Sequence, residues 1–154
     1  MVAMINKALF TSNKEDWETP QDFYDRLNAK YHFEWDLAAS DDNAKCSCYF
    51  TRDDNSLEQD WEGLSGNLFL NPPYGRELKL WVKKAATTGL KDKQNLVMLI
   101  PSRTDTSYWH DYIFGKANIT FIRGRLKFEL DGVSGDSAPF PSAVVIYTGD
   151  GDDD

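Results

Sequence analysis

One uninterrupted apolar run, Leu96-Val97-Met98-Leu99-Ile100, constrains the fold of this chain more than any other segment. Pro101 ends the run, which is short for a helix and typical of a strand covered on both faces of a sheet. Such a strand needs helices above and below it. The run therefore predicts an α/β fold with an open, mostly parallel sheet.

Helical and strand-like patterns alternate along the rest of the sequence. Thr19 predicts a helix N-cap, with Pro20 at the first helical position. Further helices are expected over 77–89, closed by its last glycine, and over 106–114. Strands are expected over 33–37, 48–51, 67–70, 119–122, 126–130 and 143–147. The last strands predict an antiparallel hairpin at the end of the sheet.

The length of 154 residues suits a single hydrophobic core. We expect an N-terminal extension over 1–16, one domain over 17–148 and an acidic tail over 149–154. No apolar stretch approaches the roughly 20 residues that span a bilayer, and no cleavable signal is evident, which predicts a cytoplasmic protein. Cys46 and Cys48 have no histidines at metal-type spacing, so we expect two reduced thiols and no metal.

Charge is distributed unevenly along the chain. The formal net charge of −8 argues against a nonspecific polyanion binder, yet residues 71–127 carry eleven Lys and Arg against four Asp and Glu, a local balance of +7. A basic middle section in an acidic chain indicates a localised nucleic-acid face. The alternative, a solvated helix surface, fits Lys79, Lys83 and Lys84, which share a helix with apolar residues.

The segment Asn71-Pro72-Pro73-Tyr74 follows an expected strand and is the strongest chemical signal. The prolines fix the backbone and remove donors, so the Asn71 amide oxygen and a neighbouring carbonyl form two acceptors on a rigid loop. Tyr74 adds a flat ring on which a base can stack. Such a loop matches a planar group with an NH2, and accepting both N–H bonds favours the pyramidal amine that attacks an electrophilic methyl. The alternative is a Pro-rich turn.

This segment resembles the (Asp/Asn/Ser)-Pro-Pro-(Tyr/Phe/Trp) signature of amino-methyltransferases that act on adenine N6, cytosine N4 and glutamine amides. Other segments narrow the resemblance to the phage and prophage DNA N-6-adenine methyltransferase (Dam-like) family, over Trp17 to Tyr147. They are Trp17-Glu18-Thr19-Pro20, Asp36-Leu37-Ala38-Ala39-Ser40, Tyr49-Phe50-Thr51, Asp60-Trp61, Ile100-Pro101-Ser102-Arg103-Thr104-Asp105-Thr106, Gly124-Arg125-Leu126-Lys127-Phe128 and Pro139-Phe140-Pro141-Ser142. The resemblance implies a Rossmann-like fold, S-adenosylmethionine as cofactor, S-adenosylhomocysteine as product, and methylation of adenine N6 in DNA, in the host cytoplasm if phage encoded.

The resemblance also implies roles for individual residues. The expected catalytic residues are Asn71, Pro72, Pro73 and Tyr74. The residues expected to bind the cofactor are Trp17, Thr19, Pro20, Asp36, Ala38, Ala39, Ser40 and Asp60. For Asp60, a plain turn carboxylate is an equal alternative. The residues expected to bind DNA are Arg103, Arg123, Arg125 and Lys127, each with a surface salt bridge as its alternative.

Specificity is expected from two loops, 102–107 and 131–142, because no insertion is long enough for a separate recognition domain. Trp81 and Trp109 lie in apolar helical patterns and are expected in the core.

Two other functions stay open: the same chemistry on a glutamine amide or another amine, and a catalytically silent nucleic-acid-binding relative. The amide enzymes usually have a glycine-rich cofactor turn, which Ala38-Ala39-Ser40 replaces here.

Overall fold

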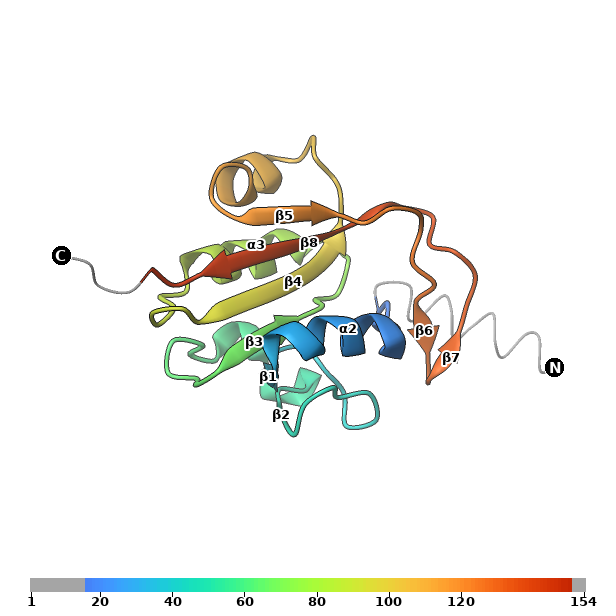
Figure 1. Cartoon of the computed structure of the whole chain (residues 1–154), viewed down its shortest axis with the longest axis horizontal. Coiled ribbons are helices and arrows are strands. Elements are labelled where there is room, and N and C mark those ends of the chain that lie inside the picture. Colours follow the sequence, from blue (N-terminus) through green and yellow to red (C-terminus); the bar gives the residue numbers. More distant parts are fainter. Residues whose placement is uncertain (1–15, 151–154) are drawn as a thin grey trace.

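The computed structural model describes residues 16–150, which form one central sheet of six strands in the order β2-β1-β3-β4-β8-β5 (Figure 1). β2, β1, β3 and β4 run parallel, whereas β8 pairs antiparallel with both β4 and β5. The expected α/β fold with a mostly parallel sheet is confirmed. The bounds are β1 Phe33–Asp36, β2 Cys48–Tyr49, β3 Asn67–Leu70, β4 Asn95–Pro101, β5 Asn118–Phe121 and β8 Ser142–Thr148.

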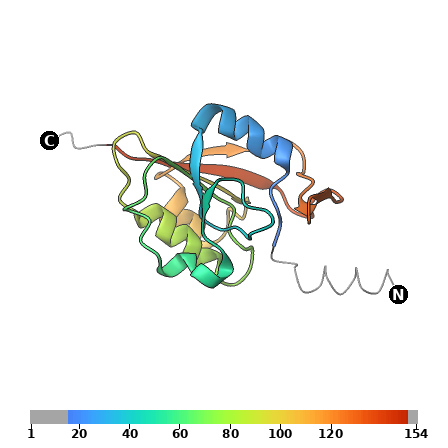
Figure 2. The same cartoon turned by 90° about the horizontal axis from the view of Figure 1, so that it is seen from below.

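Helices cover both faces of this sheet, as Figure 2 shows. Helix α2 (Gln21–Tyr31) lies on one face, and α3 (Leu78–Thr87) lies on the other together with the single π-helical turn η3 (Trp109–Ile113). Two 3-10 turns, η1 (Arg52–Asp54) and η2 (Ser56–Glu58), follow β2, and η2 packs against α3. The apolar run in β4 is fully buried between these layers, as its composition predicts.

Helix ends differ from the sequence-based expectation. Helix α2 begins at Gln21, and Pro20 occupies the N-cap position without a side-chain cap, so the prediction that Thr19 caps this helix is wrong. The Thr19 hydroxyl instead accepts a hydrogen bond from Asn71. Helix α3 ends at Thr87, and the extended Thr88, not Gly89, stands at its C-cap. For helix α2, the contact with Asn71 therefore takes the Thr19 hydroxyl that the local sequence pattern assigns to capping.

The strand expected over 126–130 is reduced to β6 (Glu129–Leu130), which pairs with β7 (Val133–Ser134) as a hairpin outside the main sheet. Asp131 and Gly132 join the two strands with φ of 53° and 82°. A two-residue turn with positive φ at both positions favours Asp-Gly. The C-terminal antiparallel pairing lies in the main sheet, between β5 and β8.

Parts of the expected chain organisation lie outside the described residues: positions 1–15 of the N-terminal extension and 151–154 of the acidic tail. Cys46 and Cys48 are free thiols, and the Cys46 sulfur lies 3.3 Å from the Tyr24 hydroxyl. None of the helices within residues 16–150 is long and apolar enough to cross a membrane.

Candidate functional site

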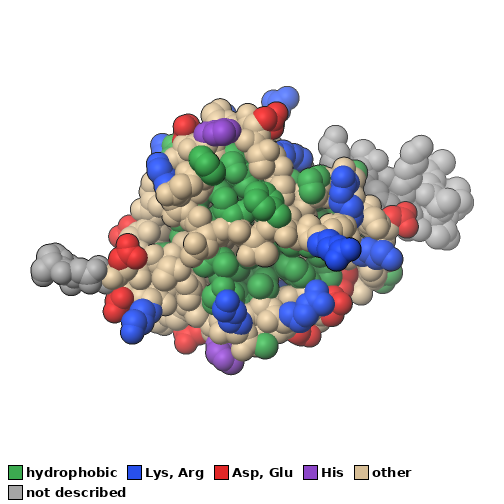
Figure 3. Space-filling model, turned by 45° about the horizontal axis from the view of Figure 1, so that its top comes forward, with side chains coloured by type: hydrophobic (Ala, Val, Ile, Leu, Met, Phe, Trp, Pro, Cys, Tyr) green, Lys and Arg blue, Asp and Glu red, His purple; other side chains and the backbone are tan. Residues whose placement is uncertain are grey.

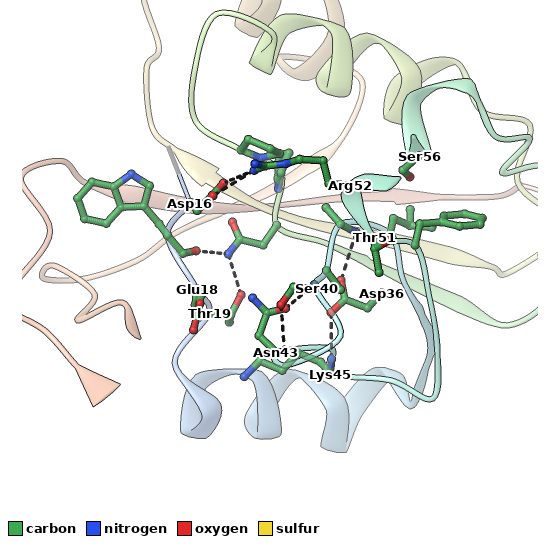
Figure 4. Close-up of a pocket in the computed structure, with 18 of the residues that line it drawn as sticks. Asp16, Glu18, Thr19, Asp36, Ser40, Asn43, Lys45, Thr51, Arg52 and Ser56 are labelled. Atoms are coloured by element: carbon green, nitrogen blue, oxygen red, sulfur yellow. Dashed lines mark hydrogen bonds and ion pairs between the residues drawn. The ribbon is translucent and has the colours of Figure 1, made fainter. Parts of the chain in front are cut away.

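The carboxyl ends of β1 and β3 open into a cavity of about 630 Å³. Ligands of open α/β sheets bind at this edge, where neighbouring parallel strands bring their following loops together. The cavity wall comes from the N-terminal segment 16–19, the segments after β1, β2 and β3, helix α3, and the β6–β7 hairpin. Figure 4 shows side chains from several of these segments converging on it.

Asn71, directly after β3, lines the cavity with its amide held in one orientation. Its Nδ2 donates to the Trp17 carbonyl oxygen at 2.6 Å and to Thr19 Oγ1 at 2.9 Å. A backbone carbonyl only accepts, so the NH2 group must face Trp17. The Asn71 Oδ1 is buried and has no hydrogen-bond partner within the described residues. The amide therefore keeps its acceptor unused.

The rest of the motif divides between the cavity and the core. Pro72 and Pro73 line the cavity, and Tyr74 does not. The Tyr74 side chain is 6% exposed, its hydroxyl donates to the Leu99 carbonyl in β4 at 2.9 Å, and its ring meets Phe128 and Phe140 edge to face. Core packing therefore encloses the Tyr74 ring in this structure, and the stacking of a base on Tyr74 stays a prediction.

Asp36 ends β1 and lies on the cavity wall with only 3% of its surface exposed. Its carboxylate accepts hydrogen bonds from the backbone N–H of Lys45 at 3.0 Å and of Ala38 at 3.3 Å. Burial raises the pKa of Asp36 to about 6, although these two N–H groups act in the opposite direction. A buried carboxylate whose ionisation is disfavoured in this way gains from a cation beside it.

The turn Ala38-Ala39-Ser40 also lines the cavity. Its three N–H groups are bonded within the protein, to the side chain of Asp36, the carbonyl of Phe50 and the side chain of Asn43. The turn therefore offers small side chains to a ligand, and its backbone donors are already used.

Of the other residues expected to hold the cofactor, some line the cavity and others do not. Trp17 and Thr19 line the cavity, whereas Pro20 is buried at the start of α2. Asp60 is exposed and away from the cavity wall, and its Oδ1 accepts from the Glu62 backbone N–H at 2.9 Å. The Asp60 carboxylate therefore closes a local turn in this structure, as the alternative expects, and its contact with the cofactor stays a prediction.

The cavity wall is strongly acidic. Two cationic side chains, Lys45 and Arg52, stand against seven carboxylates, a formal balance of −5. The carboxylates belong to Asp16, Glu18, Asp36, Asp41, Asp53, Glu77 and Asp131. Arg52 pairs with Asp16 at 3.1 Å, which joins the segment after β2 to the N-terminal segment (Figure 4). This wall favours a cationic ligand.

The four residues expected to bind DNA, Arg103, Arg123, Arg125 and Lys127, are all exposed and lie outside the cavity wall. None of them pairs with a carboxylate within residues 16–150, so the salt-bridge alternative fails there. Arg125 donates to the Ala138 carbonyl at 3.2 Å. Three of the four lie on the segment that leads into the cavity-lining hairpin. Figure 3 shows Lys and Arg side chains around the outline of one face, most densely at the right of the view.

Sequence reasoning missed several residues of the wall. Leu130 and Asp131 reach it from the β6–β7 hairpin, which the Asp131-Gly132 pair signals in the sequence. Trp81 was expected in the core; it is buried there and also lines the cavity. Nothing in the local pattern distinguishes Trp81 from Trp109, which is buried without reaching the cavity.

These observations define an α/β protein with an acidic ligand cavity beside an Asn-Pro-Pro loop. The chain belongs to the DNA N-6-adenine-methyltransferase (Dam) family, whose model matches residues 7–147. It is 30% identical to the DNA N-6-adenine-methyltransferase of Escherichia phage T1 over 75% of this chain and 48% of that protein. It is 26% identical to the protein of the same name from Haemophilus phage HP1 over 88% of this chain and 80% of that protein. The chain thus spans about half the length of the T1 relative.

Proposed function

We propose that this protein transfers a methyl group from S-adenosylmethionine to the N6 amine of adenine in DNA. The proposal takes residues 17–148 as the methyltransferase domain and the fold as Rossmann-like. The sheet order, with the single antiparallel strand β8 next to the edge strand β5, supports that fold. Family membership and the names of the two phage relatives support the activity.

The unused acceptor of Asn71 carries the proposal. An unpaired buried oxygen is costly unless a ligand supplies a donor. The amide cannot flip to pair it, because Trp17 and Thr19 hold the NH2 side. Asn71 is thus preorganised to accept a hydrogen bond from an amine, and the adjacent Pro72 carbonyl supplies the second acceptor.

The chain's own residues position the amine for attack. A target adenine leaves the base stack to reach a cavity of this kind. Hydrogen bonds from its N6 to Asn71 Oδ1 and to the Pro72 carbonyl favour the pyramidal nitrogen of the transition state. The rigid proline backbone holds both acceptors at fixed positions, which limits reorganisation during the reaction.

The cavity wall fits a cationic methyl donor. S-adenosylmethionine, when bound, supplies an electrophilic sulfonium methyl, and its net charge is opposite to that of the wall. Trp17, Thr19, Asp36 and the turn Ala38-Ala39-Ser40 would hold it. Asp36 is buried without a cationic side chain bonded to it among the described residues, which suits a positively charged ligand.

DNA would approach from the side that carries Arg103, Arg123, Arg125 and Lys127. All four are exposed and unpaired with carboxylates in the described part of the chain, so they are available to phosphates or base edges. The loop 102–107, which includes Arg103, and the loop 131–142 would supply sequence specificity.

Single-turnover methyl transfer to defined DNA, with saturating S-adenosylmethionine and nucleoside mass spectrometry of the product, tests the proposal. Asn71→Ala should slow formation of N6-methyladenine roughly a hundredfold or more, as loss of one preorganised polar group does. Its affinity for S-adenosylhomocysteine should change far less.

Asn118→Ala is the matched control, because Asn118 is exposed on β5 and remote from the cavity wall. Wild-type rates in Asn71→Ala would overturn the mechanism. Absence of N6-methyladenine from wild-type reactions, with methyl transfer to a protein amide or to no substrate at all, would overturn the function.

A further inference from the structure

Two neighbouring tryptophans, Trp61 and Trp81, differ in whether the indole N–H has a hydrogen-bond partner. The rings of Trp61 and Trp81 lie 6.1 Å apart at an interplanar angle of 30°, and both side chains are buried. The Trp61 Nε1 donates to the backbone oxygen of Ser56 at 3.1 Å and to its hydroxyl at 3.2 Å. The Trp81 Nε1 is also buried but has no hydrogen-bond partner within the described residues.

An indole N–H normally finds an acceptor when it is buried, because an unpaired donor loses its hydration without compensation. Trp81 stands on the cavity wall with 8% of its surface exposed. Ser56 and Leu57 of η2 line the wall as well, and η2 packs against α3. An unpaired donor beside apolar surface on a cavity wall suits a flat ring that carries an acceptor nitrogen.

We propose that the Trp81 indole N–H donates a hydrogen bond to a ring nitrogen of the adenine of S-adenosylmethionine. The inference rests on the proposed function, which supplies the cofactor. The N6 amine of the target adenine is assigned instead to Asn71 and Pro72, on the loop after β3, whereas Trp81 lies on helix α3. Trp81 is then a binding residue that orients the cofactor's purine at the α3–η2 wall.

Removing the N–H without changing the shape tests the inference. In one variant Trp81 is replaced by 3-benzothienylalanine, which keeps the bicyclic ring and lacks the donor; the second variant is Trp81→Phe. Calorimetric titration with S-adenosylhomocysteine should show about five- to tenfold weaker binding in the benzothienyl protein, the usual effect of one lost neutral hydrogen bond. The same replacement at Trp109, which is buried away from the cavity wall, is the control and should leave the affinity unchanged.

Analogues of the ligand identify the acceptor. Among 1-deaza, 3-deaza and 7-deaza forms of S-adenosylhomocysteine, one should bind the wild-type protein about five- to tenfold more weakly. The same analogue should show no additional loss with the benzothienyl protein, since the hydrogen bond is already absent there. This coupling between one ring nitrogen and one side chain is what a double-mutant cycle measures.

Unchanged affinity in the benzothienyl protein overturns the inference, even if Trp81→Phe binds more weakly, because the side chain then acts only through its shape. A loss confined to DNA binding also overturns it, because the donor then serves the target base. In both cases a wild-type protein that binds the cofactor and methylates DNA leaves the proposed function standing. A wild-type protein that binds no S-adenosylhomocysteine would contradict both.

Discussion

Asp36 shows how burial changes the chemistry of a single residue. Its position at the end of β1 follows from the sequence, but its ionisation depends on the 3% exposure that packing leaves it. Because burial raises the pKa to about 6, Asp36 is largely ionised at pH 7.5 and largely protonated at pH 5. Lys45 is the charged side chain that acts on it most directly.

Affinity for the cationic S-adenosylmethionine should therefore decrease as the pH falls through about 6. The ionised carboxylate attracts the cofactor, and protonation removes that attraction. Titration calorimetry of the wild-type protein between pH 5 and 7.5 measures the effect, and Asp36→Asn should remove it. Equal pH dependence in the wild type and in Asp36→Asn would show that another group is responsible.

At the scale of elements, the loop after β3 is joined to β4 through the buried Tyr74 hydroxyl and the Leu99 carbonyl. Tyr74→Phe leaves that carbonyl unpaired and should lower the free energy of unfolding by about 1 kcal/mol, measured by urea denaturation. The methylation rate should change little, because the ring is enclosed in the core. A large loss of rate with unchanged stability would mean that the ring reaches the substrate after all.

The loop after β4 and the segment between β5 and β6 carry the proposed DNA contacts. Arg103→Ala in the first and Arg125→Ala in the second should each weaken DNA binding and reduce its dependence on salt concentration, because fewer counterions are released. Lys79→Ala is the matched control, since Lys79 is exposed on α3, among the lysines attributed to a solvated helix surface. Binding isotherms at several salt concentrations measure these effects, and equal behaviour of all three variants would contradict the assignment.

At the scale of the whole molecule, the proposed function assigns ligands of opposite charge to the acidic cavity wall and to the basic segment. S-adenosylmethionine carries one more positive charge than S-adenosylhomocysteine, so the wall with its balance of −5 should favour the donor over the product. The ratio of the affinity for S-adenosylmethionine to the affinity for S-adenosylhomocysteine should fall as salt screens the charges of the wall. Titrating both ligands at low and high salt tests this, and a salt-independent ratio would assign the preference to short-range contacts.

The position of the Asn-Pro-Pro loop on the cavity wall and the layers of the fold were accessible from the sequence. The apolar run in β4 needs helices on both sides, and the two prolines after Asn71 end β3 at the sheet edge where ligands bind. The Asp131-Gly132 pair indicates a hairpin, because these two adjacent residues favour the backbone angles of a two-residue turn. These features depend on neighbours along the chain, and local conformational preferences encode them.

Tertiary structure decided which polar groups are paired within the protein and which side chains reach the cavity. Asn71 is oriented by Trp17 and Thr19, more than fifty positions earlier, and the same contact withdraws Thr19 from helix capping. Tyr74 is enclosed by Phe128 and Phe140, and Trp81 reaches the cavity while Trp109 does not. A sequence determines where polar and apolar groups occur, whereas the long-range contacts of the folded chain determine which of those groups remain without a partner.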